Sequence, residues 1–109
     1  MRTSLLGVLI CTLAQPAAAE VKGASTNGFE VESRVELPMP PAQLYHAFAE
    51  VPRWWSGDHT YSGNAANLSL ELRPGGCWCE KLPSGGGVEH MRVAYVEPGK
   101  RIVLTGSLG

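Results

Sequence analysis

The sequence predicts an α+β domain, with an antiparallel sheet and two short helices that follow its first strand. The first observation is a strand-like alternation of apolar and charged residues over 29–37, which gives way to a helical pattern over 42–49. The second is a series of strand candidates between residues 68 and 105, separated by short loops rich in glycine and proline. This order of elements is typical of helices packed on one face of an antiparallel sheet.

The first 19 residues differ in composition from the rest of the chain. Arg2 supplies a positive charge, residues 5–13 are apolar, and residues 17–19 are alanines of the kind that precede a signal-peptidase cleavage site. The apolar run of about nine residues is much shorter than the roughly 20 that span a bilayer, which argues against a membrane anchor. We therefore expect a secretory signal peptide over 1–19, cleaved after Ala19, and a periplasmic or secreted protein.

The mature chain is expected to begin with a flexible lead-in over 20–28, because these residues are small and polar. The strand predicted over 29–37 alternates apolar residues such as Phe29 and Val31 with glutamate and arginine. One of its faces is therefore apolar, and the charged face is expected to lie in solvent. The domain itself is placed at 29–109.

Proline separates the first strand from the helices. The prolines within 38–41 end the strand, because proline cannot donate to a ladder, and they are tolerated in the first turn of a helix. A helix is expected over 42–49, where apolar residues recur three or four positions apart. A short helical turn or tight corner is expected over 53–55. It is followed by a polar loop over 56–67, which carries His59 and is the kind of segment that often holds binding residues.

The centre of the domain is a predicted hairpin. Residues 68–72 alternate leucine with polar residues, and the Pro-Gly-Gly of 74–76 supplies a turn that folds them back onto 77–80. Further strands are expected over 88–97 and 101–105, which completes a meander. The sequence stops soon after the last strand and would leave a sheet edge and an apolar face uncovered. We therefore expect the domain to be truncated at its C-terminus.

Cys77 and Cys79 are the cysteines of the expected mature chain, since Cys11 lies in the signal peptide. On one extended strand their Cα atoms approach the upper limit for a disulfide and their side chains run parallel, so we expect free thiols. A metal site is not expected, because the spacing of the two cysteines is not that of a zinc knuckle and the sequence indicates no fourth ligand. No cofactor is expected.

The charges exclude two classes of partner. The formal net charge is -1 at pH 7, and the lysines and arginines are scattered along the chain. No basic patch for nucleic acid or for an anionic membrane is therefore predicted. We expect no nucleic-acid partner and, after signal cleavage, no membrane partner.

Three segments carry a resemblance to a known family. In this order, VELPMPPAQLYHAFAEVPRWWS, LSLELRPGGCWCE and VAYVEPGKRIVLTGSLG resemble the SRPBCC (START, birch-pollen-allergen-like) superfamily. The most similar group is named for the activator of the ninety-kilodalton heat-shock protein's ATPase and includes proteins labelled polyketide cyclase or dehydrase. The resemblance implies a helix-grip fold, in which a curved antiparallel sheet wraps a long C-terminal helix and leaves a cavity for a small ligand. This chain would be the N-terminal part of that fold, without the long C-terminal helix.

From this resemblance we predict only the fold and the cavity. We do not predict the chaperone role, because an exported protein cannot activate a cytosolic chaperone. Trp54 and Trp55 lie at the corner between the helix and the polar loop. They are candidates for the wall or lid of the cavity mouth, where aromatic rings contact an apolar ligand. Plain packing under the sheet is the alternative for one of the two.

The register of the second hairpin decides which side chains share a face. A register with Leu82 opposite Val88 is expected. Two further pairs then face each other, Glu80 with His90 and Trp78 with Arg92. These four would form a polar face, and the other face would be apolar, formed by Cys77, Cys79, Met91, Val93 and Tyr95. The polar face would serve a ligand carboxylate or proton transfer, or be a solvent-facing charge pair, and we favour the charge pair because such pairs are common on exposed sheets.

We expect an exported SRPBCC-type module that binds a small hydrophobic molecule in a cavity between sheet and helix, with no catalytic residue assigned. One alternative is a cyclase- or dehydrase-like enzyme in which Glu80 and His90, or His59, carry protons. Another is a protein-interaction module related to the ATPase activators, with an unknown protein partner. The candidate ligand-binding residues are Trp54, Trp55, Tyr61, Trp78, Glu80, His90 and Arg92.

Overall fold

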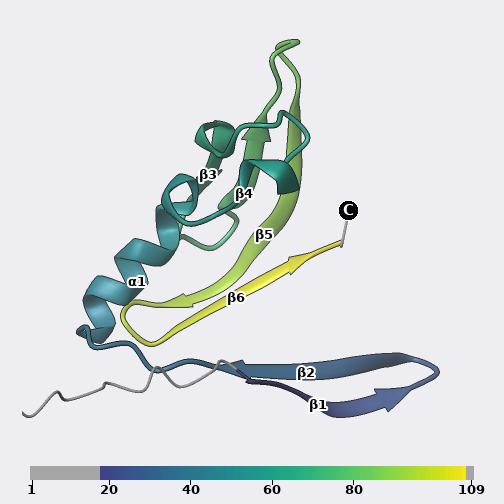
Figure 1. Ribbon diagram of the computed structural model, residues 1–109, viewed down its shortest axis with the longest axis vertical. Coiled ribbons are helices and arrows are strands. Elements are labelled where there is room, and N and C mark those ends of the chain that lie inside the picture. The colour runs from purple at the N-terminus through teal and green to yellow at the C-terminus, as the bar shows by residue number, and fades with distance from the viewer. Residues whose placement is uncertain (1–17, 108–109) are drawn as a thin grey trace, which may run out of the picture. The chain divides into compact units, whose positions relative to one another are not determined.

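The computed structural model describes residues 18–107, which form an α+β structure with two antiparallel sheets (Figure 1). The chain divides after Leu37 into two compact units. Within the described residues, no helix is long and apolar enough to cross a membrane. The predicted signal peptide lies outside the described residues, apart from Ala18 and Ala19.

The first unit is a two-stranded hairpin of β1 (Ala18–Ser25) and β2 (Gly28–Arg34). The strand predicted over 29–37 is confirmed in β2, although it ends at Arg34. The segment 20–28, in contrast, is mostly strand, so the expected flexible conformation is wrong. Residues of β1 pair with β2 along its whole length, with one register shift between Val21 and Gly23, and this ladder outweighs the weak strand preference of small polar residues.

The second unit begins with α1 (Pro41–Ala49), which confirms the predicted helix. The carbonyl of Pro40 accepts hydrogen bonds from the N–H groups of Gln43 and Leu44 and so starts the helix. A short helical turn is present as the 3-10 helix η1 (Val51–Arg53), but it lies two residues before the predicted 53–55. Two more 3-10 helices, η2 (Gly57–His59) and η3 (Ala65–Asn67), lie within the predicted loop, and the side chains of Ser56 and Asn64 cap them.

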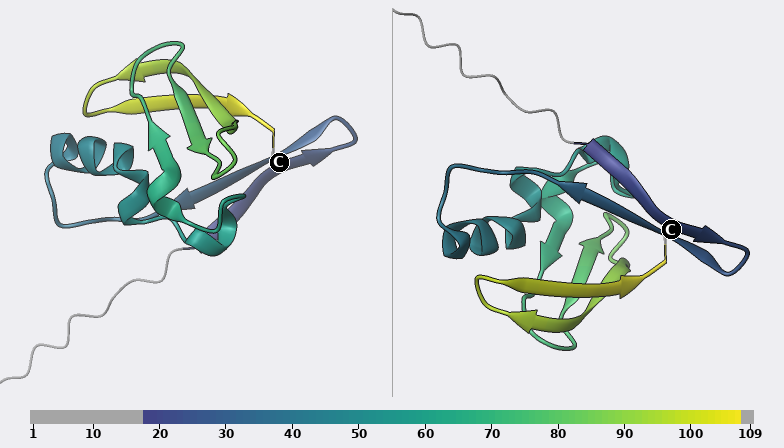
Figure 2. Two further views of the ribbon diagram at one scale, coloured as in Figure 1. Left: turned by 90° about the horizontal axis from the view of Figure 1, so that it is seen from above. Right: turned by 90° about the horizontal axis from the view of Figure 1, so that it is seen from below.

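A four-stranded sheet follows in the order β3-β4-β5-β6. Its strands are β3 (Leu68–Leu70), β4 (Cys77–Lys81), β5 (Gly87–Glu97) and β6 (Arg101–Gly106), which confirms the predicted meander. Figure 2 shows the long hairpin of β5 and β6, in green to yellow, from two further directions.

The strand β3 is shorter than predicted because the turn after it bonds to a different strand. Gly75 N–H donates to the carbonyl of Val93 at 2.9 Å, and Val93 N–H donates to the carbonyl of Gly76 at 2.8 Å. A Cβ atom at Gly76 would clash with the backbone oxygen atoms of Glu71 and Arg73, so this close turn requires glycine.

The register predicted for β4 and β5 is wrong. Glu80 lies opposite Val88 and not opposite His90, because Leu82 N–H donates to the Gly86 carbonyl and closes the turn earlier than expected. A β-bulge then shifts the register by one residue at His90. Two further pairs follow the bulge, Trp78 with Met91 and Cys77 with Arg92.

The assignment of faces to β4 is also corrected. Trp78 and Glu80 are buried, at 7% and 2% exposure, so their face belongs to the core and is not the solvent-facing polar face that we expected. The cause lies in β3, where Leu70 and Leu68 pair with these two residues and carry them inward. The core of the second unit consists of Val51, Leu68, Leu70, Trp78 and Val93.

Candidate functional site

The most distinctive packing feature of the second unit is a cluster of four aromatic rings. Trp78 of β4 contacts Trp55, Trp54 and Phe48 with ring centroids 5.1, 5.8 and 6.5 Å away, all in edge-to-face geometry. Phe48 of α1 also stacks on Trp54 at 5.4 Å. Edge-to-face contacts of this kind stabilise beyond the area they bury. The cluster therefore fixes the corner after α1 against the sheet.

Hydrogen bonds fix the two tryptophans at that corner. Trp55 Nε1 donates to the carbonyl of His59 at 2.9 Å, and Trp54 Nε1 donates to the carbonyl of Phe48 at 3.3 Å. Both side chains nevertheless remain partly exposed, at 37% for Trp55 and 45% for Trp54. Large rings that are held in place and still reach solvent are typical of a binding surface.

A pocket of about 150 Å³ lies against this cluster, and we name it the Trp55 pocket. It is lined by Trp55, His59, Leu68, Trp78, His90, Met91 and Ser107. Trp55, Trp78 and His90 are among the candidate ligand-binding residues predicted from the sequence. Trp54 lies beside the pocket in the aromatic cluster and is not part of its lining.

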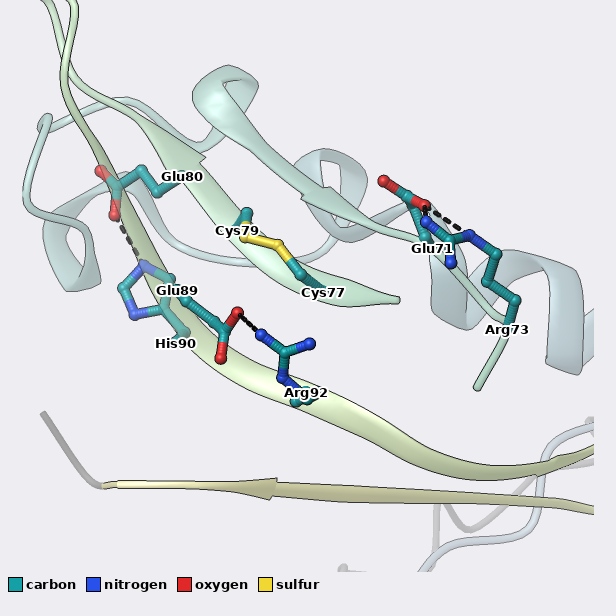
Figure 3. The surroundings of a disulfide bond; sticks show 8 residues. All are labelled: Glu71, Arg73, Cys77, Cys79, Glu80, Glu89, His90 and Arg92. Atoms are coloured by element: carbon teal, nitrogen blue, oxygen red, sulfur yellow. Dashed lines mark hydrogen bonds and ion pairs between the residues drawn. A yellow bond between two sulfur atoms is a disulfide. The ribbon is translucent and has the colours of Figure 1, made fainter. Parts of the chain in front are cut away.

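Glu80 lies behind the pocket as a buried carboxylate with three hydrogen-bond donors. Its Oε1 accepts from Ser62 N–H at 2.6 Å, and its Oε2 accepts from Tyr61 N–H at 3.2 Å. Its Oε2 also lies 2.8 Å from Nε2 of His90, and Figure 3 shows these two side chains reaching toward each other from β4 and β5. Glu80 thus joins the polar loop to the sheet.

The environment of Glu80 holds it ionised. Burial alone would raise the pKa of this carboxyl group, but hydrogen bonds from Ser62, His90 and Tyr61 outweigh that effect and lower its pKa to about 2. At neutral pH the group is therefore a fixed hydrogen-bond acceptor and cannot act as a general acid.

The ionised state of Glu80 determines the tautomer of His90. A carboxylate can only accept, so His90 Nε2 must carry a proton and donate it to Oε2. The second ring nitrogen, Nδ1, makes no hydrogen bond within residues 18–107. The His90 side chain is 24% exposed and lines the Trp55 pocket. A neutral His90 therefore keeps Nδ1 as an acceptor for a ligand or a proton.

The remaining predicted residues lie apart from the pocket. The Tyr61 ring is mostly exposed and rests against His90 at 5.8 Å between centroids, outside the pocket lining. Arg92 is exposed, and its Nη2 donates to Glu89 Oε2 at 2.6 Å. The structure therefore groups Glu80, His90 and Tyr61 together, with Trp78 nearby in the pocket wall, and separates Arg92 from them.

Cys77 and Cys79 form a disulfide, which corrects the expectation of free thiols (Figure 3). Their Cα atoms are 5.4 Å apart, within the range of disulfides and shorter than the about 6.6 Å that two residues span on an extended strand. β4 is therefore locally contracted between the two cysteines, beside the point where its register with β5 shifts. Both cysteines are half-buried on the face of β4 opposite Trp78.

Three lining residues were not predicted as site residues, namely Leu68, Met91 and Ser107. Leu68 and Met91 look like ordinary strand residues in the sequence, and Met91 reaches the pocket only because the bulge turns its face inward. Nothing in the local sequence signals that bulge. Comparisons with known proteins return no match to a protein-family model, a curated protein or a solved structure.

Proposed function

We propose that the unit from Pro38 onward binds a small apolar molecule in the Trp55 pocket. The observation that supports this most is the wall of the pocket. Trp55 and Trp78 line it, the aromatic cluster holds both rings in place before any ligand arrives, and the indole N–H of Trp55 also donates to the carbonyl of His59. A preformed apolar wall keeps the ordering cost of binding low.

The volume of the pocket limits the ligand. A cavity of about 150 Å³ accommodates a single six-membered ring, whereas drug-sized ligands occupy roughly 300 Å³ or more. Two imidazoles, from His59 and His90, also line the pocket. The preferred ligand is therefore a single-ring or short-chain molecule with one polar atom facing His90.

The finer fold proposal is that this unit belongs to the helix-grip fold of the SRPBCC superfamily and acts after export from the cytoplasm. What supports it is the order of one helix before an antiparallel meander, together with the sequence segments that resemble that superfamily. In such a fold the ligand cavity lies against the sheet, which agrees with the position of the Trp55 pocket on β3, β4 and β5.

Replacing Trp55 by alanine is expected to weaken the binding of toluene and phenol. Losing one aromatic wall contact removes about 1 kcal/mol of binding free energy, a roughly fivefold to tenfold loss of affinity. Ligand-observed NMR titrations of both probes measure this loss.

The matched control for Trp55→Ala is Tyr95→Ala. Tyr95 is an aromatic residue of similar exposure, at 47%, and it does not line the Trp55 pocket. Its replacement is expected to leave both affinities unchanged. Equal affinities in wild type and Trp55→Ala, with both proteins folded, would contradict binding in this pocket.

A second candidate function is acid–base catalysis on a carbonyl compound. It is favoured by His90, whose Nε2 is held by an ionised Glu80 while the ring lines the pocket. The proton carrier would then be His90 Nδ1, with Glu80 as the residue that orients the ring, because Glu80 itself stays ionised. Catalysis requires Glu80 and His90 to face inward, as they do here. A surface charge pair would instead face solvent.

The enzyme hypothesis predicts that the protein accelerates exchange of the α-protons of 2-butanone for deuterium in D₂O. A positioned base of this kind contributes about 100-fold or more to a proton transfer, so His90→Gln should return the rate to background. His46→Gln, on α1 and outside the pocket, should leave it unchanged. Exchange at the background rate in the wild type would contradict the enzyme hypothesis and leave ligand binding as the proposed function.

A further inference from the structure

Three potential metal ligands, the two cysteines of the disulfide and a glutamate, lie together on the side of the sheet opposite Trp78. Cys77 and Cys79 come from β4, and Glu89 lies opposite Cys79 on β5. Their sulfur atoms and a carboxylate oxygen lie within 4.8 Å of one another. Figure 3 shows Glu89 extending toward this group, with Arg92 beside it.

We propose that Cys77, Cys79 and Glu89 bind a thiophilic divalent cation such as Zn²⁺ when the disulfide is reduced. Thiolates select soft and borderline metals, and a three-ligand zinc site takes water in its fourth position. Ligand atoms around a tetrahedral zinc lie about 3.3 to 3.8 Å apart, given bond lengths of about 2.0 to 2.3 Å. The 4.8 Å limit is observed with the two sulfur atoms bonded to each other, so metal binding requires the reduced thiols to separate and the exposed Glu89 side chain to rotate toward them.

Charge balance favours a divalent ion at this site. The two thiolates and the Glu89 carboxylate carry three negative charges, which a divalent ion and the guanidinium of Arg92 together neutralise. Arg92 Nη2 donates to Oε2 of Glu89 at 2.6 Å and leaves Oε1 available to the ion. A residue that orients a metal-binding carboxylate in this way typically strengthens metal binding.

The disulfide and the metal site are alternative states of the same two sulfur atoms. An external dithiol transfers two electrons and two protons to the disulfide, becomes a cyclic disulfide itself and leaves Cys77 and Cys79 as thiols. Binding of the divalent ion then releases the two thiol protons. The fold is retained, because β4 pairs with β3 and β5 on either side and the crosslink spans a single residue.

The test uses the full chain with Cys11→Ser, which removes the third cysteine. After reduction, anaerobic removal of the reductant and a circular dichroism check, Co²⁺ is added as a spectroscopic substitute for Zn²⁺. We expect thiolate-to-cobalt charge-transfer absorption that saturates at one ion per chain and is displaced by Zn²⁺. The oxidised protein should show none.

Variants of Glu89 and Glu71 distinguish a defined metal site from nonspecific binding of the metal ion to the thiols. Glu89→Gln should weaken Co²⁺ affinity by about 10-fold or more, judged from the 10- to 100-fold effects of losing supporting residues at metal sites. Glu71→Gln is the matched control, since Glu71 is also exposed and ion-paired to an arginine, Arg73, but lies outside the cluster. Absence of the charge-transfer band, loss of the fold on reduction, or equal affinities in all three proteins would each overturn the proposal.

Discussion

Replacing Glu80 by glutamine is expected to lower the free energy of unfolding by about 3 kcal/mol at pH 7. The carboxylate accepts hydrogen bonds from Ser62 N–H, Tyr61 N–H and the His90 ring while it is fully buried. A glutamine has a single acceptor oxygen and an NH₂ group that would face one of these donors. Urea denaturation followed by circular dichroism measures the loss.

Glu97→Gln is the control for the Glu80 prediction. Glu97 is a partly exposed glutamate whose Oε1 pairs with Lys100 at 2.7 Å, and exposed pairs of this kind contribute at most about 1 kcal/mol. A loss below about 1 kcal/mol for Glu80→Gln, or equal losses in the two variants, would show that the Glu80 hydrogen bonds do not stabilise the fold.

Acid provides an independent measurement of the same carboxylate. Its pKa is about 2 in the folded protein, below the about 4.3 of a glutamate in an unfolded chain. The group therefore contributes stability that is fully present above about pH 5 and is lost as the pH falls toward 2. Wild type should lose stability over this range, and Glu80→Gln should show a shallower dependence. Parallel pH profiles would contradict the lowered pKa.

Replacing Trp78 by alanine is expected to lower the free energy of unfolding by about 4 kcal/mol, because it removes a buried ring that contacts three other aromatic rings. Trp54→Ala is the matched control. Trp54 belongs to the same cluster but is 45% exposed, so its loss should cost about half as much. Urea denaturation measures both variants. Equal losses would mean that Trp78 does not organise the core.

Local signals in the sequence predict most of the elements of the second unit. The prolines of 38–41 mark the start of α1, and the Pro-Gly-Gly of 74–76 marks the turn between β3 and β4. What the sequence could not predict depends on long-range pairing. Residues 20–25 form a strand only because β2 supplies a partner, and the register of β4 on β5 depends on one turn and one bulge.

The candidate site was predictable in part, for the same reason. The contact between Glu80 and His90 was predicted because the two residues are neighbours on adjacent strands. The structure contains this contact, although the predicted register is wrong. The face on which they lie depends on Leu68 and Leu70 of β3, which no pattern within β4 reveals. The disulfide likewise depends on a local contraction of β4 that alternation alone does not predict.

The central claim, that the Trp55 pocket binds a small apolar molecule, is tested most directly by NMR of methionine methyl groups. Met91 lines the pocket, whereas Met39 is 41% exposed and lies outside its lining. In a toluene titration of methyl-labelled protein, we expect the Met91 signal to shift and saturate because the ring of the ligand lies next to it, while the Met39 signal stays in place. A Met91 signal that does not move, or that moves together with Met39 without saturating, would contradict the claim.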